Sequence, residues 1–299
     1  SGEVAGTAVL EPLDEEAAGA IKGVSLTPQE SNIEITIGGK PFTAYRTDSG
    51  PKPILYPLIG PGGQRLTRDY PMETVEGEDK DHPHHRSLWF TFGKVNGEDF
   101  WTELKDHGSI QETAKRSVIS GPALGRLRTT DRWVSSQGKH VLDDERIVTI
   151  YRTDTARILD FEITLRALDV PVTFADTKEG MFAVRVASSM DADQPGGGTL
   201  VNGEGLGGEQ AWGKASPWVD YFGPVDGKQV GIAILNHPRS FRYPTTWHVR
   251  TYGLFAANPF GWHDFGLGKS GEHVLPAGQT LWFGYRLILH DGDTAAGQI

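Results

Sequence analysis

Cysteine is absent from this sequence of 299 residues. The absence excludes a disulfide framework, a thiolate zinc site, an iron–sulfur cluster and a cysteine nucleophile. It suits an oxidising compartment, where stray thiols are a liability, although some cytosolic proteins also lack them.

Long apolar runs, excess positive charge and helical periodicity are lacking as well. No apolar run approaches the roughly 20 residues that span a bilayer, so we expect no membrane insertion. The formal net charge is −10, from 29 Lys and Arg against 39 Asp and Glu. We therefore expect no nucleic-acid partner, because binding one requires a basic surface. Motifs for nucleotide binding, phosphoryl transfer and serine-esterase chemistry are missing too.

Short segments with alternating apolar and polar side chains are abundant. In segment 159–167 every second side chain is apolar, which is typical of a strand with one buried face. Similar patterns predict strands at 32–37, 42–46, 146–151, 181–186, 229–235 and 280–290. The pairs Gly38-Gly39, Asn96-Gly97 and Asp226-Gly227 are typical of tight hairpin turns.

The best helix candidate is the short segment 14–22. Many strands with frequent turns and no alternation of strands and helices predict an all-β fold, a large antiparallel β-sandwich. We assign residues 1–30 to an N-terminal extension and 31–299 to a single β-sandwich domain.

Histidines are concentrated just before an apolar strand predicted at 88–92. His82, His84 and His85 fall within four positions and directly follow Asp81. In an extended segment, His82 and His84 would share one face and His85 would point to the other. A same-face pair could bind a metal, or one imidazole could act as acid or base with a carboxylate orienting it.

Charged side chains stand at the start of another predicted strand. Asp176, Lys178 and Glu179 immediately precede the segment 181–186. Loops of β-sandwiches often present functional groups at such places. The alternative is a charged turn whose ion pairs contribute little.

A third segment would place His248, Arg250 and Tyr252 on one face of a strand, with Trp247 and Val249 opposite. This polar stripe is an unusual choice for either a core or a plain surface.

Aromatic side chains accompany these polar segments. Trp89 and Trp101 follow the histidines, and Asn258 lies in an aromatic-rich turn with Trp262. Indole faces that stack on sugar rings, beside groups that read hydroxyls, suit a polyhydroxylated ligand.

These motifs together resemble a bacterial family of unknown function that is commonly labelled the PmoA family. The resemblance covers about residues 33 to 291 and rests on Tyr56-Pro57-Leu58, Pro61-x-Gly63, Asp81-His82-Pro83-His84-His85-Arg86-Ser87-Leu88-Trp89, Asn96-Gly97-x-Asp99-Phe100-Trp101, Asp176-Thr177-Lys178-Glu179-Gly180, Asn236-His237-Pro238, Trp247-His248-x-Arg250-x-Tyr252-Gly253, Ala257-Asn258-Pro259-Phe260-Gly261 and Tyr285-Arg286-Leu287. The label borrows the name of a methane monooxygenase subunit, which is a membrane protein. We reject that activity because this chain has no membrane segment.

The resemblance implies a carbohydrate role and supplies no reaction or catalytic residues. With the length and strand content, it leads us to expect a galactose-mutarotase-like supersandwich. It also implies a periplasmic or secreted protein, whose leader is absent from this sequence.

The first functional hypothesis is a carbohydrate-active enzyme, a lyase, epimerase or hydrolase, acting on a sugar or an oxidised glycoside. His84 or His85 with His248 would supply acid and base, and Glu179 would orient or replace one of them. The candidates for substrate binding are Asp81, Arg86, Trp89, Asp176, Lys178, Arg250, Tyr252 and Asn258. Among these, Arg86, Lys178 and Arg250 could hold a carboxylate or enolate.

Two alternatives remain open. A non-catalytic glycan-binding protein would need the aromatic and hydrogen-bonding groups, but not histidines gathered with cations. A metal-dependent carbohydrate enzyme would use His82, His84 and either His248 or Glu179 as ligands of a divalent metal. The first hypothesis requires no cofactor.

Overall fold

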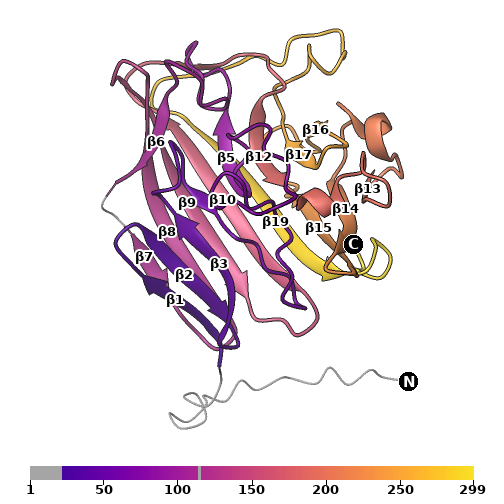
Figure 1. The fold of residues 1–299 in the computed structure, drawn as a ribbon. Coiled ribbons are helices and arrows are strands. Elements are labelled where there is room, and N and C mark those ends of the chain that lie inside the picture. The colour runs from indigo at the N-terminus through magenta and orange to yellow at the C-terminus, as the bar shows by residue number, and fades with distance from the viewer. Residues whose placement is uncertain (1–21, 114–115) are drawn as a thin grey trace, which may run out of the picture.

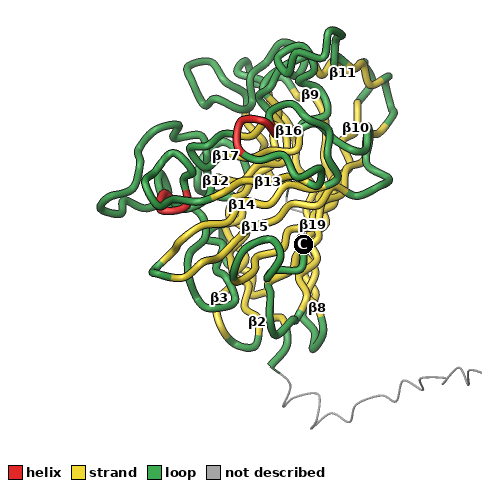
Figure 2. Tube along the Cα trace, turned by 90° about the vertical axis from the view of Figure 1, so that its right-hand side faces the viewer, coloured by secondary structure: helices red, strands yellow, loops and turns green. Residues whose placement is uncertain are grey.

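Antiparallel strands make up nearly all the regular structure in the computed structural model, which describes residues 22–113 and 116–299 (Figure 1). Within these residues the helical segments are two short 3-10 helices, η1 (Ser188–Met190) and η2 (Gly208–Ala211), drawn red in Figure 2. No helix in this part of the chain has the length and apolarity needed to cross a membrane.

Two large sheets and one small sheet hold the strands. The eight-stranded sheet has the order β1-β2-β3-β4-β5-β12-β17-β16. Its strands are β1 (Val24–Pro28), β2 (Asn32–Ile37), β3 (Lys40–Arg46), β4 (Ile54–Leu55), β5 (Leu88–Phe92), β12 (Gly180–Arg185), β17 (Leu254–Ala257) and β16 (Trp247–Val249). The small sheet pairs β11 (Val172–Phe174) with β18 (His273–Leu275).

The nine-stranded sheet has the order β13-β14-β15-β19-β10-β9-β8-β6, with β7 also paired to β8. Its strands are β13 (Thr199–Asn202), β14 (Trp218–Val225), β15 (Lys228–Asn236), β19 (Thr280–Asp291), β10 (Arg157–Ala167), β9 (His140–Tyr151), β8 (Leu124–Val134), β6 (Ser109–Glu112) and β7 (Ser117–Ile119).

The main core lies where the inner faces of the two large sheets meet. Phe161 of β10 contacts Phe90 of β5 and Phe182 of β12, with ring centroids 6.2 and 4.8 Å apart. Burying each large apolar side chain contributes about 1.5–3 kcal/mol relative to leaving it in water. The predicted antiparallel β-sandwich is therefore confirmed.

The alternating patterns placed most predicted strands correctly. Segment 32–37 is β2, 88–92 is β5, and 159–167 lies within β10. The three predicted turn pairs all have positive φ, as tight hairpin turns require.

The predicted extension at 1–30 and the helix candidate at 14–22 fall mainly on residues 1–21, which lie outside the described residues. Of the remainder, Val24–Pro28 forms β1, paired with β2.

A second, smaller apolar cluster covers the outer face of the eight-stranded sheet. Its members are Ile54, Tyr56, Trp89, Trp101, Ala183, Leu254 and Ala256, with Met72 and Tyr252 packed against them. Loops bury this outer face, and most of the predicted site residues lie there.

Candidate active site

One row of residues crosses four neighbouring strands and forms the floor of the site. Trp89 of β5 lies opposite Ala183 of β12, Ala183 lies opposite Ala256 of β17, and Ala256 lies opposite His248 of β16. The two small alanines leave room above the sheet, and Trp101 occupies that room. Its ring centroid lies 5.3 Å from Trp89 and 6.4 Å from His248.

The loop after β5 fixes Trp101 through Asp99. The Asp99 carboxylate accepts the backbone N–H of Trp101 at 2.7 Å and that of Thr102 at 3.1 Å. These bonds form an Asx-type turn, which short polar side chains stabilise locally. The sequence Asn96-Gly97-x-Asp99-Phe100-Trp101 thus brings a buried indole to the site.

The three clustered histidines lie in a turn and not in an extended segment. The backbone N–H of His85 donates to the carbonyl of His82 at 2.9 Å, with Pro83 at the turn position that its fixed φ favours. The three rings therefore contact one another. His85 lies 4.7 Å from His82 and 4.5 Å from His84, measured between ring centroids.

Two buried arginines converge on Asp81. Arg185 donates to both Asp81 oxygens at 3.0 and 3.2 Å, and Arg68 forms an ion pair with the same carboxylate. Burial raises the pKa of the second nearby acid, Asp191, to about 8, and its carboxyl lies 3.9 Å from Arg185. Asp81 is the carboxylate that pairs closely with both guanidiniums.

Lys52 and Arg86 form a similar group on the other side of the histidines. Arg86 binds both oxygens of Glu103, at 2.7 to 3.1 Å, and Lys52 forms an ion pair with the same carboxylate. Burial lowers the pKa of Lys52 to about 8, which leaves the ammonium largely charged at pH 7. This group also has two cations for one anion.

Three imidazoles of this site, those of His84, His85 and His248, are neutral at pH 7. Burial lowers the pKa of His84 to about 4 and that of His248 to about 3, and it holds the pKa of His85 well below its usual range. The neighbouring cations act in the same direction, since Lys52 lowers the pKa of His84 and Arg185 lowers that of His85.

A backbone contact sets the tautomer of His248. Its Nδ1 lies 2.7 Å from the carbonyl oxygen of Lys178. Because a carbonyl can only accept, Nδ1 carries the proton and Nε2 carries the lone pair. Nε2 is buried and has no hydrogen-bond partner among the described residues, and the same holds for the indole N–H groups of Trp89 and Trp101.

The charged groups beside His248 are partly accessible. Lys178 and Glu179 form an ion pair with each other, and both side chains are half-buried. The Arg250 guanidinium lies 3.7 Å from the ring centroid of Trp212 and lines a hollow of about 290 Å³.

Tyr252 joins the histidine turn to this region. It occupies the turn between β16 and β17, and its ring stacks on His82 at 5.1 Å, with the Arg185 guanidinium 4.9 Å from its centroid. The strand expected to continue to residue 252 ends at Val249, because the chain turns back into β17. His248 does face away from Trp247 and Val249, which lie in the core.

Two predicted ligand-binding residues have internal partners instead. Asp176 accepts backbone N–H groups of His263 and Gly271. Asn258 is fully buried, donates to the Thr177 carbonyl and accepts from the backbone of Phe260 and Gly261. Both side chains hold loops in place.

The metal-ligand hypothesis gains no support from the geometry. Among the described residues, no group of three or more His, Asp and Glu side chains is arranged to hold a metal ion. His82, His84, His248 and Glu179 do not form such a set.

Several charged residues of the site were missed from sequence. Arg185 is the one charged side chain of β12, whose other residues are apolar or glycine. A buried cation in such a strand is a usable signal, because isolated charges are rarely buried without a partner. Arg68, Lys52 and Glu103 carry no comparable signal in the chain.

The fold and site define an antiparallel β-sandwich with a buried cluster of histidines and tryptophans over one sheet, flanked by arginine and lysine side chains that pair with Asp81 and Glu103. The chain belongs to a family of unknown function (DUF6807), whose model matches residues 32–299. The match does not confirm the PmoA label. No curated protein matches the sequence.

Solved structures that are similar to this chain include three carbohydrate-related proteins. A galactose mutarotase-like protein from Lactobacillus casei is 11% identical, with 90% of this chain and 100% of that chain covered and a TM-score of 0.45. A glycoside hydrolase family 97 enzyme from Pseudoalteromonas, in complex with panose, is 13% identical, with 92% and 34% covered and a TM-score of 0.36. This chain thus spans about a third of that enzyme's length.

A third structure, a family 36 α-galactosidase from Geobacillus stearothermophilus, is 10% identical, with 91% and 41% covered and a TM-score of 0.34. With TM-scores below 0.5, these structures carry no argument about activity.

Proposed function

We propose that the chain is a carbohydrate-active enzyme that uses acid–base chemistry on a sugar bearing a carboxylate or a keto group. The observation that carries this proposal is the set of three unpartnered polar atoms in the aromatic cluster, His248 Nε2 and the indole N–H groups of Trp89 and Trp101. Buried polar groups normally have partners. One acceptor and two donors beside indole faces match sugar hydroxyls, which both donate and accept.

His248 and Tyr252 have the protonation states that a base and an acid need. His248 is neutral, and its lone pair is directed away from the Lys178 carbonyl. Burial raises the pKa of Tyr252 above its usual value, so its phenol keeps a proton to donate. A base that removes a proton next to a carbonyl and an acid that protonates the leaving oxygen are the groups required for β-elimination.

The cations that surround Asp81 and Glu103 favour a substrate that carries or develops negative charge. Asp81 faces two arginines, and Glu103 faces Arg86 and Lys52. A carboxylate on the substrate, or the enolate formed by proton removal, is stabilised by fixed positive charge in a site of low dielectric constant. In this proposal the half-buried His84, whose pKa is lowered by burial and by the nearby Lys52, contacts the sugar.

Glycan binding without catalysis is the second candidate, and one observation favours it. Asp81, Glu103 and Glu179 are all ion-paired, which leaves no free carboxylate among them to act as a base. In this reading the imidazoles only donate and accept hydrogen bonds. The expected periplasmic or secreted location fits both candidates and stays a prediction.

The experiment is incubation of the protein with a panel of uronic-acid oligosaccharides, 3-keto glycosides and native glycosides, read by mass spectrometry and NMR. We expect a new product with the wild type. His248→Gln and Tyr252→Phe should lower turnover by about 10²- to 10⁴-fold, the usual contribution of an acid or base. His263→Gln is the matched control, because His263 is exposed.

Binding without conversion across the panel would favour the glycan-binding candidate. Full turnover in His248→Gln would show that the proposed base is wrong.

A further inference from the structure

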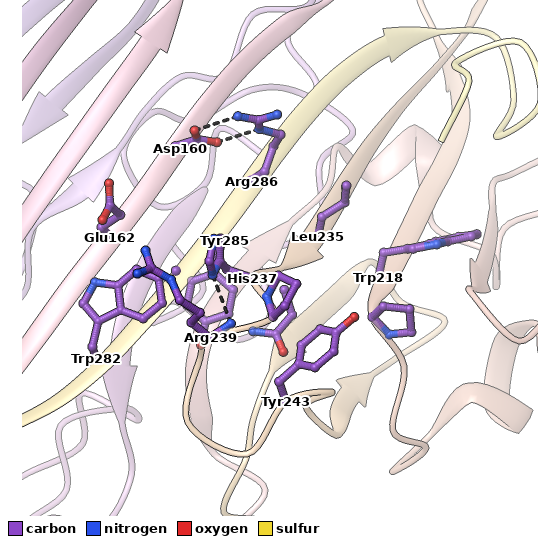
Figure 3. A pocket seen from close by; sticks show the side chains of 14 residues that line it. Asp160, Glu162, Trp218, Leu235, His237, Arg239, Tyr243, Trp282, Tyr285 and Arg286 are labelled. Atoms are coloured by element: carbon purple, nitrogen blue, oxygen red, sulfur yellow. Dashed lines mark hydrogen bonds and ion pairs between the residues drawn. The ribbon is translucent and has the colours of Figure 1, made fainter.

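A second hollow lies on the outer face of the other sheet. It has a volume of about 550 Å³ and is lined by residues of β10, β14, β15 and β19 and of the loop after β15 (Figure 3). This volume lies within the range of about 300–1,000 Å³ found for small-molecule sites. The motif Asn236-His237-Pro238 is part of this lining, and the proposed active site makes no use of it.

Trp282 lies flat against the sheet because Gly284, two residues further along β19, has no side chain. A Cβ atom on Gly284 would come 2.5 Å from Cη2 of Trp282 and 3.1 Å from Cβ of His237. The His237 ring meets the indole edge-on, with centroids 5.2 Å apart and an interplanar angle of 88°. The sequence therefore holds one indole as a platform on the sheet.

Arg239 covers the outer side of this indole, with its guanidinium carbon 5.5 Å from the ring centroid. Arg239 is exposed, and an exposed cation–π contact contributes only about 0.5–1 kcal/mol. A sugar ring can therefore replace the guanidinium on the indole, and the displaced donors remain in reach of sugar hydroxyls. Figure 3 shows Trp218 and Tyr243 on the opposite side of the hollow.

The acidic side chains of the hollow differ in their pairing. Asp160 accepts hydrogen bonds from Nε and Nη2 of Arg286, at 2.7 and 2.8 Å. Glu162 lies opposite Gly284 on β19, and its side chain forms no hydrogen bond or ion pair with another described residue. Its half-buried carboxylate is thus a free acceptor next to the Trp282 platform.

The charges of the hollow balance. Asp160 and Glu162 are matched by Arg239 and Arg286, in contrast to the surplus of cations at the site on the eight-stranded sheet. A balanced hollow with aromatic walls and one free acceptor favours a neutral ligand that donates hydrogen bonds.

We propose that this hollow is a second carbohydrate-binding site, which holds a neutral pyranoside ring. The ring stacks on Trp282, and one of its hydroxyls donates to Glu162. This site is separate from the proposed active site, so its existence does not depend on the proposed function.

The test is titration of the protein with cellotriose, followed through the indole N–H signals of its eight tryptophans in NMR. Cellotriose is the probe because its ring hydroxyls are equatorial, which leaves apolar C–H faces for stacking. We expect a saturable shift of the Trp282 signal, assigned with Trp282→Phe.

Trp282→Ala should raise the dissociation constant at least about 10-fold, the equivalent of about 1.4 kcal/mol. Glu162→Gln keeps a neutral acceptor and should raise it about 3- to 10-fold, since hydrogen bonds to charged groups are the stronger ones. Trp262→Ala is the matched control, because Trp262 also lies under an arginine, Arg242, in a different loop. This control should bind as the wild type does.

Absence of a saturable shift in the wild type would overturn the proposal, as would unchanged binding by both Trp282→Ala and Glu162→Gln. If Trp282→Ala fails to fold, Trp282→Phe, with its smaller ring, decides instead. It should bind more weakly than the wild type at equal thermal stability, and equal affinity would count against the platform.

Discussion

Replacing Asp81 by Asn tests whether the site holds a surplus of buried positive charge. Arg68 and Arg185 are fully buried, and Asp81 supplies the negative charge closest to both. Breaking a fully buried ion pair costs about 3–5 kcal/mol. The Asp81 side chain is 38% exposed, and solvent screening reduces that cost. We therefore expect Asp81→Asn to lower the free energy of unfolding by about 2–3 kcal/mol at pH 7.

The stability difference between the wild type and Asp81→Asn should depend on pH in a defined direction. Burial opposes ionisation of Asp81, but hydrogen bonds and charges from Arg185, His82 and Arg68 hold its pKa well below the usual range. Its contribution to stability is therefore complete above the unfolded pKa of about 3.9 and is lost as the pH falls through the depressed folded pKa. The difference between the wild type and Asp81→Asn should shrink below about pH 4.

Urea denaturation at pH 7, 5, 4 and 3 measures this difference. The control is Asp48→Asn, because Asp48 pairs with Arg46 on the surface and should contribute at most about 1 kcal/mol. A loss below about 0.5 kcal/mol at pH 7, or a difference that grows in acid, would refute the charge account.

Two further predictions concern buried polar groups. His248 has a folded pKa of about 3, below its ordinary 6.5, so the unfolded state binds more protons between these values and acid destabilises the fold. Urea denaturation from pH 7 to 4 should show a smaller loss of stability for His248→Gln than for the wild type, and equal losses would contradict the assigned shift. The Trp133 indole donates to Asp144 at 2.7 Å inside the core, so Trp133→Phe should cost about 2–4 kcal/mol. Urea denaturation of Trp133→Phe and of the control Trp262→Phe checks this value. Similar denaturation midpoints for the two variants would contradict it.

Strand β10 shows why some strands could be predicted from the sequence. In β10 the inward residues Leu159, Phe161, Ile163 and Leu165 leave a clear period of two. In β8 the buried face also carries Thr129 and Asp131, so the apolar period is interrupted and the strand was missed.

The site could be predicted in part for a related reason. His84, His85, His248 and Tyr252 stand out as polar groups in local motifs, and the fold brings them into one cluster. The convergence of Arg68 and Arg185 on Asp81 could not be predicted, because the two residues are far apart in sequence and meet through a backbone hydrogen bond beside the isolated bridge of Thr67 with Val186. Asn258 has the composition of a ligand-binding residue, yet it binds the backbone of its own turn.

The central claim is that this site transfers protons at a sugar carbon, and hydrogen–deuterium exchange tests it most directly. A 3-keto glycoside dissolved in D₂O with catalytic amounts of protein is followed by proton NMR. Faster loss of the signal from the carbon next to the keto group, abolished in His248→Gln and kept in His263→Gln, is the predicted result. Exchange at the uncatalysed rate with the wild type, while the same glycoside binds, would contradict acid–base catalysis on that glycoside.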